Sequence, residues 1–261
     1  MNSTQLVDLE FNKRKQNWQY VDLMDRDLLL FKTVLEQKFL TRFHVIHNVF
    51  KGMKSYAEIR IRKLKKFDYL KPIHLLVGEP ESYLLSERSV QALKEAGYVI
   101  GTMGFPLEFG VTLPEPQEKI ELAFYDHDKR VTNVRFLFEA LGFCKDWHSE
   151  KVLKLGQRGE RKVPDGFFTR NGKGIAIEVE LTAKKAETYR KIFEVYTREK
   201  KIDYIFYICG DLSIRKKIME LSRGKIDKPI CFTLYDNLIQ YREKTNIKIH
   251  EDEFELKRLL G

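Results

Sequence analysis

Residues 163–185 read VPDGFFTRNGKGIAIEVELTAKK, and this stretch decides how the chain is interpreted. Its Asn-Gly pair lies between two apolar runs, which is a strong signal for a β-hairpin. Side chains alternate along a strand, so Glu178 and Glu180 share one face. Ile175, Ile177, Val179 and Leu181 take the other. The hairpin then brings Asp165 alongside Glu178. The sequence therefore predicts acidic side chains gathered on one side of a sheet.

The composition favours a polyanionic partner. The chain has 261 residues, 43% of them hydrophobic, and its 47 Lys and Arg against 38 Asp and Glu give a net charge of +9. Double-stranded DNA is the first candidate and an anionic membrane surface the second. No apolar run approaches the length of a membrane span, and the three cysteines lack metal-site spacing. We expect a cytoplasmic protein with reduced thiols and no membrane partner.

The N-terminal part, 1–99, has the element order of a winged helix-turn-helix domain that follows a polar lead-in over 1–20. Apolar periodicity and capping residues predict three helices, then two short strands around a Gly-Glu-Pro turn, then one more helix. The predicted helices cover 25–40, 41–50, 55–70 and 86–98, and the strands cover 71–77 and 82–86.

The third predicted helix carries an unusual positive charge. Eight Lys and Arg against two acids fall between Lys51 and Lys71. Ala57, Ile61 and Leu64 share the spacing of an inward face, which leaves the basic side free to enter a major groove. The alternative is a solvated basic face on an ordinary helical domain. The predicted DNA-contacting residues are Lys51, Lys54, Ser55, Tyr56, Arg60, Arg62, Lys63 and Lys66.

After a Gly- and Pro-rich linker, 100–125, the rest of the chain, 126–261, predicts an α/β domain with a mixed sheet. The expected order is α-β-β-β-α-β-α-β, and two late strands are apolar enough to be buried on both faces. The predicted helices cover 131–143, 183–199, 212–224 and 253–260, and the strands cover 144–153, 164–170, 174–182, 202–210 and 229–239.

The gathered carboxylates suggest a metal site. Like charges repel unless a cation lies between them, and oxygen ligands of this kind suit Mg²⁺ or Mn²⁺. Such an ion can activate water and polarise a phosphodiester. The alternative is an ordinary hairpin with acids on its solvent-facing side. In that case Asp165 and Glu178 have no chemical role.

Pro164-Asp165 followed by Glu178-Val179-Glu180 resembles the PD-(D/E)xK nuclease superfamily, as does the order of elements from residue 131. The resemblance implies that Asp165 and Glu178 hold the metal. Glu180 stands at the usual lysine position, a departure that some active members share. Other members use a displaced lysine, for which this chain offers Lys184 or Lys185. A further acid is expected from Glu139 or Glu150, and the sequence does not choose between them.

Residues 25–210 also resemble the replication-relaxation family, on YLLSERSVQALKEAG, a lone His127, Trp147 with Glu150, PDG and EVELT. The resemblance implies a DNA-binding protein of a plasmid or other mobile element, with replication, mobilisation or recombination proteins as further partners. Two functions remain open, with an RNA- or membrane-binding basic protein as a third, weaker option. One is a metal-dependent nuclease that cuts or nicks DNA at sites chosen by the winged helix. The other is an inactive DNA-binding regulator of replication, mobilisation or transcription that uses the nuclease fold as a scaffold.

Three aromatic or imidazole side chains have ordinary structural explanations. His127 is expected to brace the start of a helix, with a metal or proton role as the less favoured reading. Trp147 is expected in the core. Tyr196 is expected to pack against the sheet. No heptad pattern indicates an oligomeric state.

Overall fold

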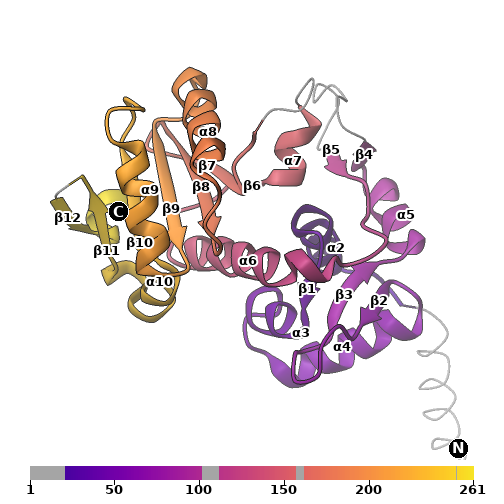
Figure 1. Cartoon of the computed structure of the whole chain (residues 1–261). Helices are drawn as coiled ribbons and strands as arrows, with labels where there is room; N and C mark the ends of the chain where they lie inside the picture. The colour runs from indigo at the N-terminus through magenta and orange to yellow at the C-terminus, as the bar shows by residue number, and fades with distance from the viewer. Residues whose placement is uncertain (1–20, 102–111, 157–161, 251) are drawn as a thin grey trace, which may run out of the picture.

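The computed structural model describes residues 21–101, 112–156, 162–250 and 252–261, so the predicted lead-in over 1–20 lies outside the described residues. The chain is a mixed α/β protein with a helical N-terminal half and a C-terminal half built on a large sheet (Figure 1). None of the helices formed by the described residues is long and apolar enough to cross a bilayer.

The N-terminal half contains the helices and the two strands that the sequence predicts, together with one short extra strand. Its three-stranded antiparallel sheet has the order β1-β3-β2. Thr41 caps the second helical segment by accepting a hydrogen bond from the backbone N–H of His44 at 3.2 Å. The elements are α2 (Asp25–Gln37), β1 (Leu40–Thr41), α3 (Arg42–His44), a π-helical turn (Val45–Val49), α4 (Lys54–Lys66), β2 (Leu70–Ile73), β3 (Ser82–Leu85) and α5 (Glu87–Glu95).

One hydrophobic core holds these elements together. Ala57, Ile61 and Leu64 of α4 are buried in it, as their spacing predicts. Part of the predicted linker joins the same core. Strand β4 (Val99–Gly101) pairs in parallel with β5 (Thr112–Pro114), and Leu113 is buried. The linker residues 102–111 between these strands lie outside the described residues.

The C-terminal half is built on a seven-stranded mixed sheet of order β12-β11-β10-β9-β8-β7-β6. Strands β8, β9 and β10 run parallel, and the pairs on either side of them are antiparallel. Both faces of the sheet are covered by helices. The strands are β6 (His148–Ser149), β7 (Gly166–Arg170), β8 (Lys173–Glu180), β9 (Tyr204–Cys209), β10 (Ile230–Leu234), β11 (Asn246–Ile249) and β12 (Asp252–Glu255).

The two faces of β8 belong to different cores. Ile175, Ile177 and Val179 pack under α6 (Tyr125–Ala140), α10 (Tyr235–Tyr241) and α11 (Leu256–Leu260). The opposite face, which includes Ala176 and both glutamates, lies under α8 (Ala186–Arg198) and α9 (Leu212–Ser222). The predicted alternation is therefore confirmed. Trp147 is in the core, as expected, and stacks on Phe168.

Two predicted strands differ from the structure, and two observed strands were not predicted. The strand expected over 144–153 is only the two-residue β6, and α7 (Glu150–Leu155) follows because Ser149 caps a helix start. The strand expected over 229–239 ends at Leu234, where α10 begins. Strands β11 and β12 were not predicted, since they are short and largely polar. The helix expected over 253–260 begins only at Leu256, because β12 takes its first residues.

Helix α6 joins the two halves. It lies between the sheet and the N-terminal helices (Figure 1), and Phe136 on it reaches the N-terminal core. Arg135 forms a buried ion pair with Glu36 of α2 at 2.7 Å. His44 Nε2 and Asn133 Oδ1 lie 2.9 Å apart across the same boundary. These contacts bring the end of α2 to the carboxyl end of β8.

Candidate carboxylate site and basic helix

The hairpin places Asp165 beside Glu178, as predicted. Asn171 and Gly172 have φ of 50° and 73°, which suits the tight turn. The register pairs Gly166 with Ile177, so the positions before and after them are neighbours across the two strands. The carboxylate pair lies at the end of the β7–β8 hairpin where α6 begins.

Asp165 is buried, and one of its carboxylate oxygens is hydrogen-bonded. Its Oδ2 atom accepts from the backbone N–H of Val179 at 2.8 Å and lies 3.3 Å from Nε2 of His127. Burial by itself raises the pKa of Asp165. The hydrogen bond from His127, together with the positive charges of Lys162 and His127, outweighs burial and lowers this pKa to about 2. Asp165 is therefore ionised at neutral pH.

His127, in the first turn of α6, connects this helix to the β7–β8 hairpin. Its Nε2 atom also lies 3.1 Å from the carbonyl oxygen of Val179, and Nδ1 lies 3.3 Å from Asp128. Burial lowers the pKa of His127, but the hydrogen bonds and charges of Asp128 and Asp165 raise it to about 10. The ring is thus an imidazolium that donates to Asp165 and to Val179. It braces the helix start against the hairpin.

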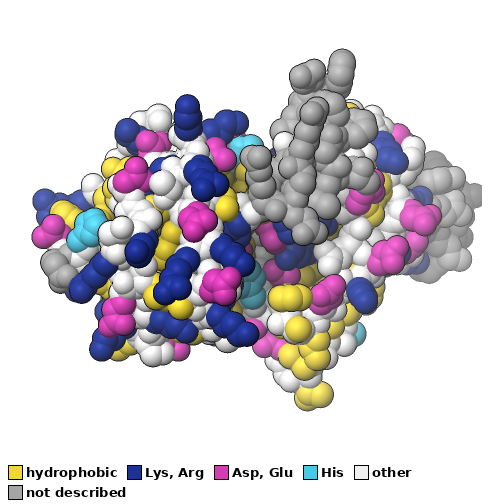
Figure 2. Space-filling model, turned by 45° about the horizontal axis from the view of Figure 1, so that its top comes forward, with side chains coloured by type: hydrophobic (Ala, Val, Ile, Leu, Met, Phe, Trp, Pro, Cys, Tyr) yellow, Lys and Arg dark blue, Asp and Glu magenta, His cyan; other side chains and the backbone are white. Residues whose placement is uncertain are grey.

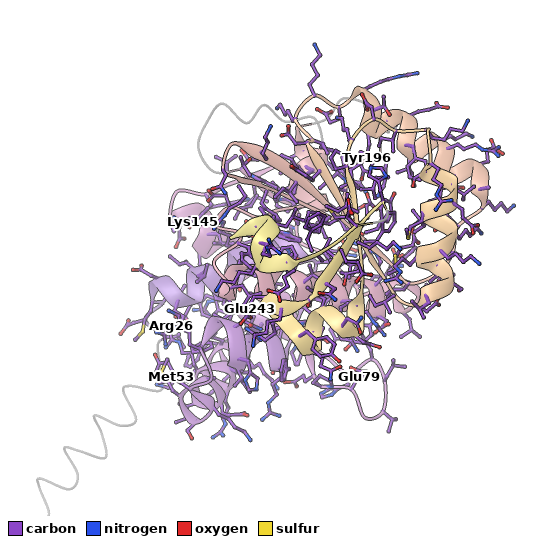
Figure 3. All side chains as sticks on the ribbon, turned by 90° about the vertical axis from the view of Figure 1, so that its left-hand side faces the viewer. Arg26, Met53, Glu79, Lys145, Tyr196 and Glu243 are labelled. Carbon is purple, nitrogen blue, oxygen red and sulfur yellow. The ribbon has the colours of Figure 1, made fainter. Side chains whose placement is uncertain are left out.

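Glu178 is paired from two sides. Only 2% of it is exposed, its carboxylate lies 2.9 Å from Nζ of Lys162, and Tyr196 of α8 donates a hydrogen bond to Oε1. Burial raises the pKa of Glu178 to about 7, helped by Asp165 and opposed by Lys162. Tyr196 packs against the sheet (Figure 3), as expected. Its hydroxyl has Glu178 as an additional partner.

Glu180 is also buried and holds its own cation. It forms an ion pair with Lys184, four residues later, before α8 begins. Lys184 therefore lies near the carboxylate strand, where the resemblance would place a displaced lysine. Its neighbour Lys185 is the exposed N-cap residue of α8. Of these two lysines, Lys184 is the one that contacts the strand.

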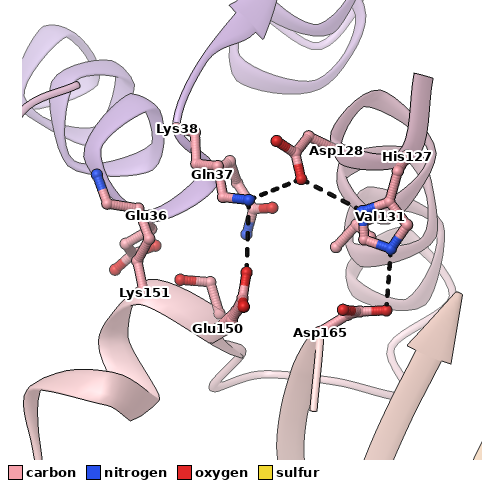
Figure 4. A pocket seen from close by; sticks show the side chains of 10 residues that line it. Glu36, Gln37, Lys38, His127, Asp128, Val131, Glu150, Lys151 and Asp165 are labelled. Carbon is pink, nitrogen blue, oxygen red and sulfur yellow. Dashed lines mark hydrogen bonds and ion pairs between the residues drawn. The ribbon is translucent and has the colours of Figure 1, made fainter. Parts of the chain in front are cut away.

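The structure separates the two candidates for an additional acid. Glu139 pairs with Arg135 at 2.8 Å on α6. Glu150 instead lines a small pocket together with Asp165 and His127 (Figure 4). The pocket volume is about 20 Å³, room for roughly one water molecule. Glu150 is therefore the acid on the Asp165 side of the site.

Lys38, from the N-terminal half, completes this pocket. It follows α2 with a φ of 73°, and its Nζ lies 2.8 Å from Asp128 and 3.4 Å from Glu150 (Figure 4). Burial lowers the pKa of Lys38, but the two carboxylates more than compensate, so the net shift is upward. The pocket is lined from both halves of the chain.

The side chains as placed do not fit a divalent metal ion. The Asp165 carboxylate and the Val179 carbonyl already share the imidazolium of His127, and Glu178 already holds the ammonium of Lys162. Within the described ranges, no three His, Cys, Asp or Glu side chains are grouped to bind one ion. Protein cations fill the positions where the predicted Mg²⁺ or Mn²⁺ would neutralise these acids.

The basic helix α4 presents most of its predicted contact residues to solvent. Lys51, Lys54, Ser55, Tyr56, Arg62 and Lys66 are exposed, and Lys63 is half-buried. On the face shown in Figure 2, by contrast, lysines and arginines of the sheet half are interspersed with acids. The segment 51–71 around α4 carries eight Lys and Arg against two acids, which is +6 of the net charge of +9.

Arg60 corrects the prediction for this helix. It is only 8% exposed and is bound to Asp27 of α2, with Nε at 2.9 Å from Oδ1. Its Nη2 atom donates to the carbonyl of Asp22 at 2.6 Å. Arg60 holds α4 to α2 and does not face solvent, so its predicted DNA contact is wrong.

Sequence reasoning did not identify three residues of the site. Lys162 lies three residues before Asp165, and this closeness in sequence could have indicated that it pairs with the acids of the hairpin. Tyr196 was expected only to pack. Lys38 is 90 residues from Asp128, and no local pattern marks it.

No protein-family model and no curated protein matches the chain. The structure has weak similarity to the crystal structure of the small subunit of the heterodimeric restriction endonuclease R.BspD6I, with a TM-score of 0.32 and 17% sequence identity. The match covers 53% of this chain and 82% of that one.

Proposed function

We propose that this protein binds double-stranded DNA through helix α4. The observation that carries the proposal is the exposed stripe Ser55, Ile59, Arg62 and Lys66, opposite the buried face of the same helix. An α-helix fits the major groove, and its cationic side chains neutralise phosphates. The apolar face of α4 packs into the N-terminal core, and Arg60 ties the helix to α2, which suits the support that a recognition helix requires.

The neighbouring elements support a winged helix-turn-helix. The helical segment over 42–49 precedes α4, and β2 and β3 form the hairpin after it. The short β1 pairs with β3 and ties the hairpin to the helices. This arrangement presents α4 on the surface while the rest of the half supports it.

For the sheet half, the geometry favours a scaffold over an active nuclease. Its three buried carboxylates, Asp165, Glu178 and Glu180, are all neutralised by side chains of the protein itself. A fully paired carboxylate cluster can stabilise a fold without metal. We therefore favour the DNA-binding regulator of replication, mobilisation or transcription. The resemblance to the replication-relaxation family suggests a plasmid or other mobile element as its context.

We expect DNA binding to depend steeply on salt and on Arg62. The Arg62→Ala variant should bind duplex DNA about tenfold more weakly and lose about one unit of the slope of log Kd against log salt. Arg190→Ala on α8 removes the same charge from an exposed position of the sheet half and should bind like the wild type. Fluorescence anisotropy with labelled duplex, single-stranded DNA and RNA measures these differences.

Two results would contradict the proposal. One is equal affinity for duplex DNA, single-stranded DNA and RNA. The other is equal loss of affinity in the Arg62 and Arg190 variants, because nonspecific charge attraction would then explain binding.

A metal-dependent nuclease is the second candidate, favoured by Asp165, Glu178 and Glu150 lying at one end of the hairpin. For the metal to bind, Lys162 and His127 would have to leave the carboxylates. We expect no nicking of supercoiled plasmid with Mg²⁺ or Mn²⁺ above the level of Asp165→Asn. Metal-dependent nicking by the wild type that the Asp165→Asn variant lacks would establish the nuclease and overturn the scaffold.

A further inference from the structure

Helix α4 carries one large apolar side chain in the middle of its outward face. Ile59 is 54% exposed and lies between Ser55 and Arg62 on the stripe that faces away from the N-terminal core. Of the hydrophobic clusters formed by the described residues, none includes Ile59. A single exposed isoleucine is common on protein surfaces, so its position matters more than its exposure.

Neither packing nor helix propensity accounts for this isoleucine. A β-branched residue is less favourable in a helix than the Lys, Arg or Glu that surround it. The other apolar side chain on this side, Tyr56, is turned toward α2. Its ring lies 5.8 Å from the guanidinium of Arg26, and its hydroxyl lies 3.6 Å from the sulfur of Met24.

We infer that Ile59 reads the 5-methyl group of a thymine in the major groove, an inference that rests on the proposed DNA binding by α4. The thymine methyl is the apolar group that base edges present in this groove. A side chain at the centre of a recognition helix reaches base edges, while residues at the margins reach phosphates. Arg62, one turn later, supplies a cation beside it and makes no ion pair within the described residues.

The arrangement gives the two residues different tasks. Arg62 can donate two parallel hydrogen bonds to guanine O6 and N7, whereas Ile59 has no polar group and gains only from burial against a methyl. Lys54 and Lys66, near the ends of the helix, suit phosphates on either side. The preferred site should therefore contain a thymine close to a guanine.

Removing the methyl from the DNA tests the inference without changing the protein. The full-length protein first selects its preferred sequence from a random duplex library. Each thymine of that sequence is then replaced singly by deoxyuridine, and the affinity of each probe is measured by anisotropy. We expect one replacement to weaken wild-type binding by about fourfold, the effect of losing one buried methyl.

The Ile59→Ala variant completes the comparison. It should bind the thymine and uracil probes equally, and Ile59→Val should keep part of the discrimination. Wild-type binding that no uracil replacement weakens, or an Ile59→Ala variant that still discriminates, would overturn the inference while DNA binding itself stands. If the wild type does not bind duplex DNA at all, the proposed function and this inference are both contradicted.

Discussion

Replacing Arg60 by alanine should lower the free energy of unfolding by about 3–5 kcal/mol, because it leaves the carboxylate of Asp27 buried without its cation. Asp27 is 1% exposed, and both of its oxygens contact the guanidinium. Its Oδ2 atom also accepts from the backbone N–H of Met24 at the start of α2. The loss should therefore loosen both the helix start and the packing of α4 on α2.

Arg62 provides a matched control for this experiment. It lies two residues further along the same helix, it is exposed, and its replacement by alanine changes helix propensity in the same way. We expect Arg62→Ala to change stability by less than about 0.5 kcal/mol. Urea unfolding followed by circular dichroism measures both variants, and equal stability of the two would contradict the buried-pair explanation.

The same two variants separate folding from DNA recognition. Arg62→Ala should keep stability and lose affinity. Arg60→Ala should lose stability, and at a temperature where it remains folded it should bind DNA nearly as well as the wild type. A specific loss of affinity in folded Arg60→Ala would restore the direct contact that the sequence predicts and the structure contradicts.

The error at Arg60 shows what helical periodicity can and cannot determine. Ala57, Ile61 and Leu64 define the inward face, and that face was predicted correctly. Arg60 lies at the margin of the face, three residues from Ala57 and four from Leu64. Whether a marginal residue is buried depends on its partner, and Asp27 lies 33 residues away in sequence. A long basic side chain can be buried where a carboxylate of another element is positioned to pair with it.

The carboxylate hairpin was predictable for the opposite reason. The alternation of side chains, the Asn-Gly turn and the short sequence separation of the two acids are all local features. Together they determine that Asp165 neighbours Glu178. Lys162 and Lys184, which pair with Glu178 and Glu180, lie close to the hairpin in sequence, but other cations of the site come from distant elements. His127 comes from α6 and Lys38 from the end of α2, so the charge balance of the site appears only in the folded chain.

Lys162 gives the sharpest test of that charge balance, because its effect should depend on pH. The pKa of Glu178 in the folded protein, about 7, lies above the 4.5 of an unperturbed glutamate. Glu178 therefore contributes stability that is complete below pH 4.5 and is lost as the pH rises through 7. Asp165 shows the reverse, since stability gained from its pKa near 2 is lost only as the pH falls from 3.8 toward 2.

Lys162→Met removes the ammonium that favours the ionised form of Glu178, so the pKa of Glu178 should rise further above 7. At pH 9 the variant must either bury an unpaired carboxylate or keep Glu178 protonated although the solution is alkaline. We expect its free energy of unfolding to be about 2–3 kcal/mol lower than that of the wild type. At pH 5 Glu178 is largely protonated in both proteins, so the loss should be well under half as large. Urea unfolding at the two pH values measures the difference.

The double variant Lys162→Met with Glu178→Gln shows whether the carboxylate is responsible. Glutamine keeps the shape of Glu178 and can still accept a hydrogen bond from Tyr196, but it carries no charge at either pH. Adding Glu178→Gln should therefore recover most of the stability that Lys162→Met loses at pH 9, and the remaining deficit should be the same at pH 5. The alternative outcome is that Lys162→Met lowers the free energy of unfolding equally at both pH values and that Glu178→Gln does not restore it. Lys162 would then stabilise the fold through the packing of its aliphatic side chain, and not through its ion pair with Glu178.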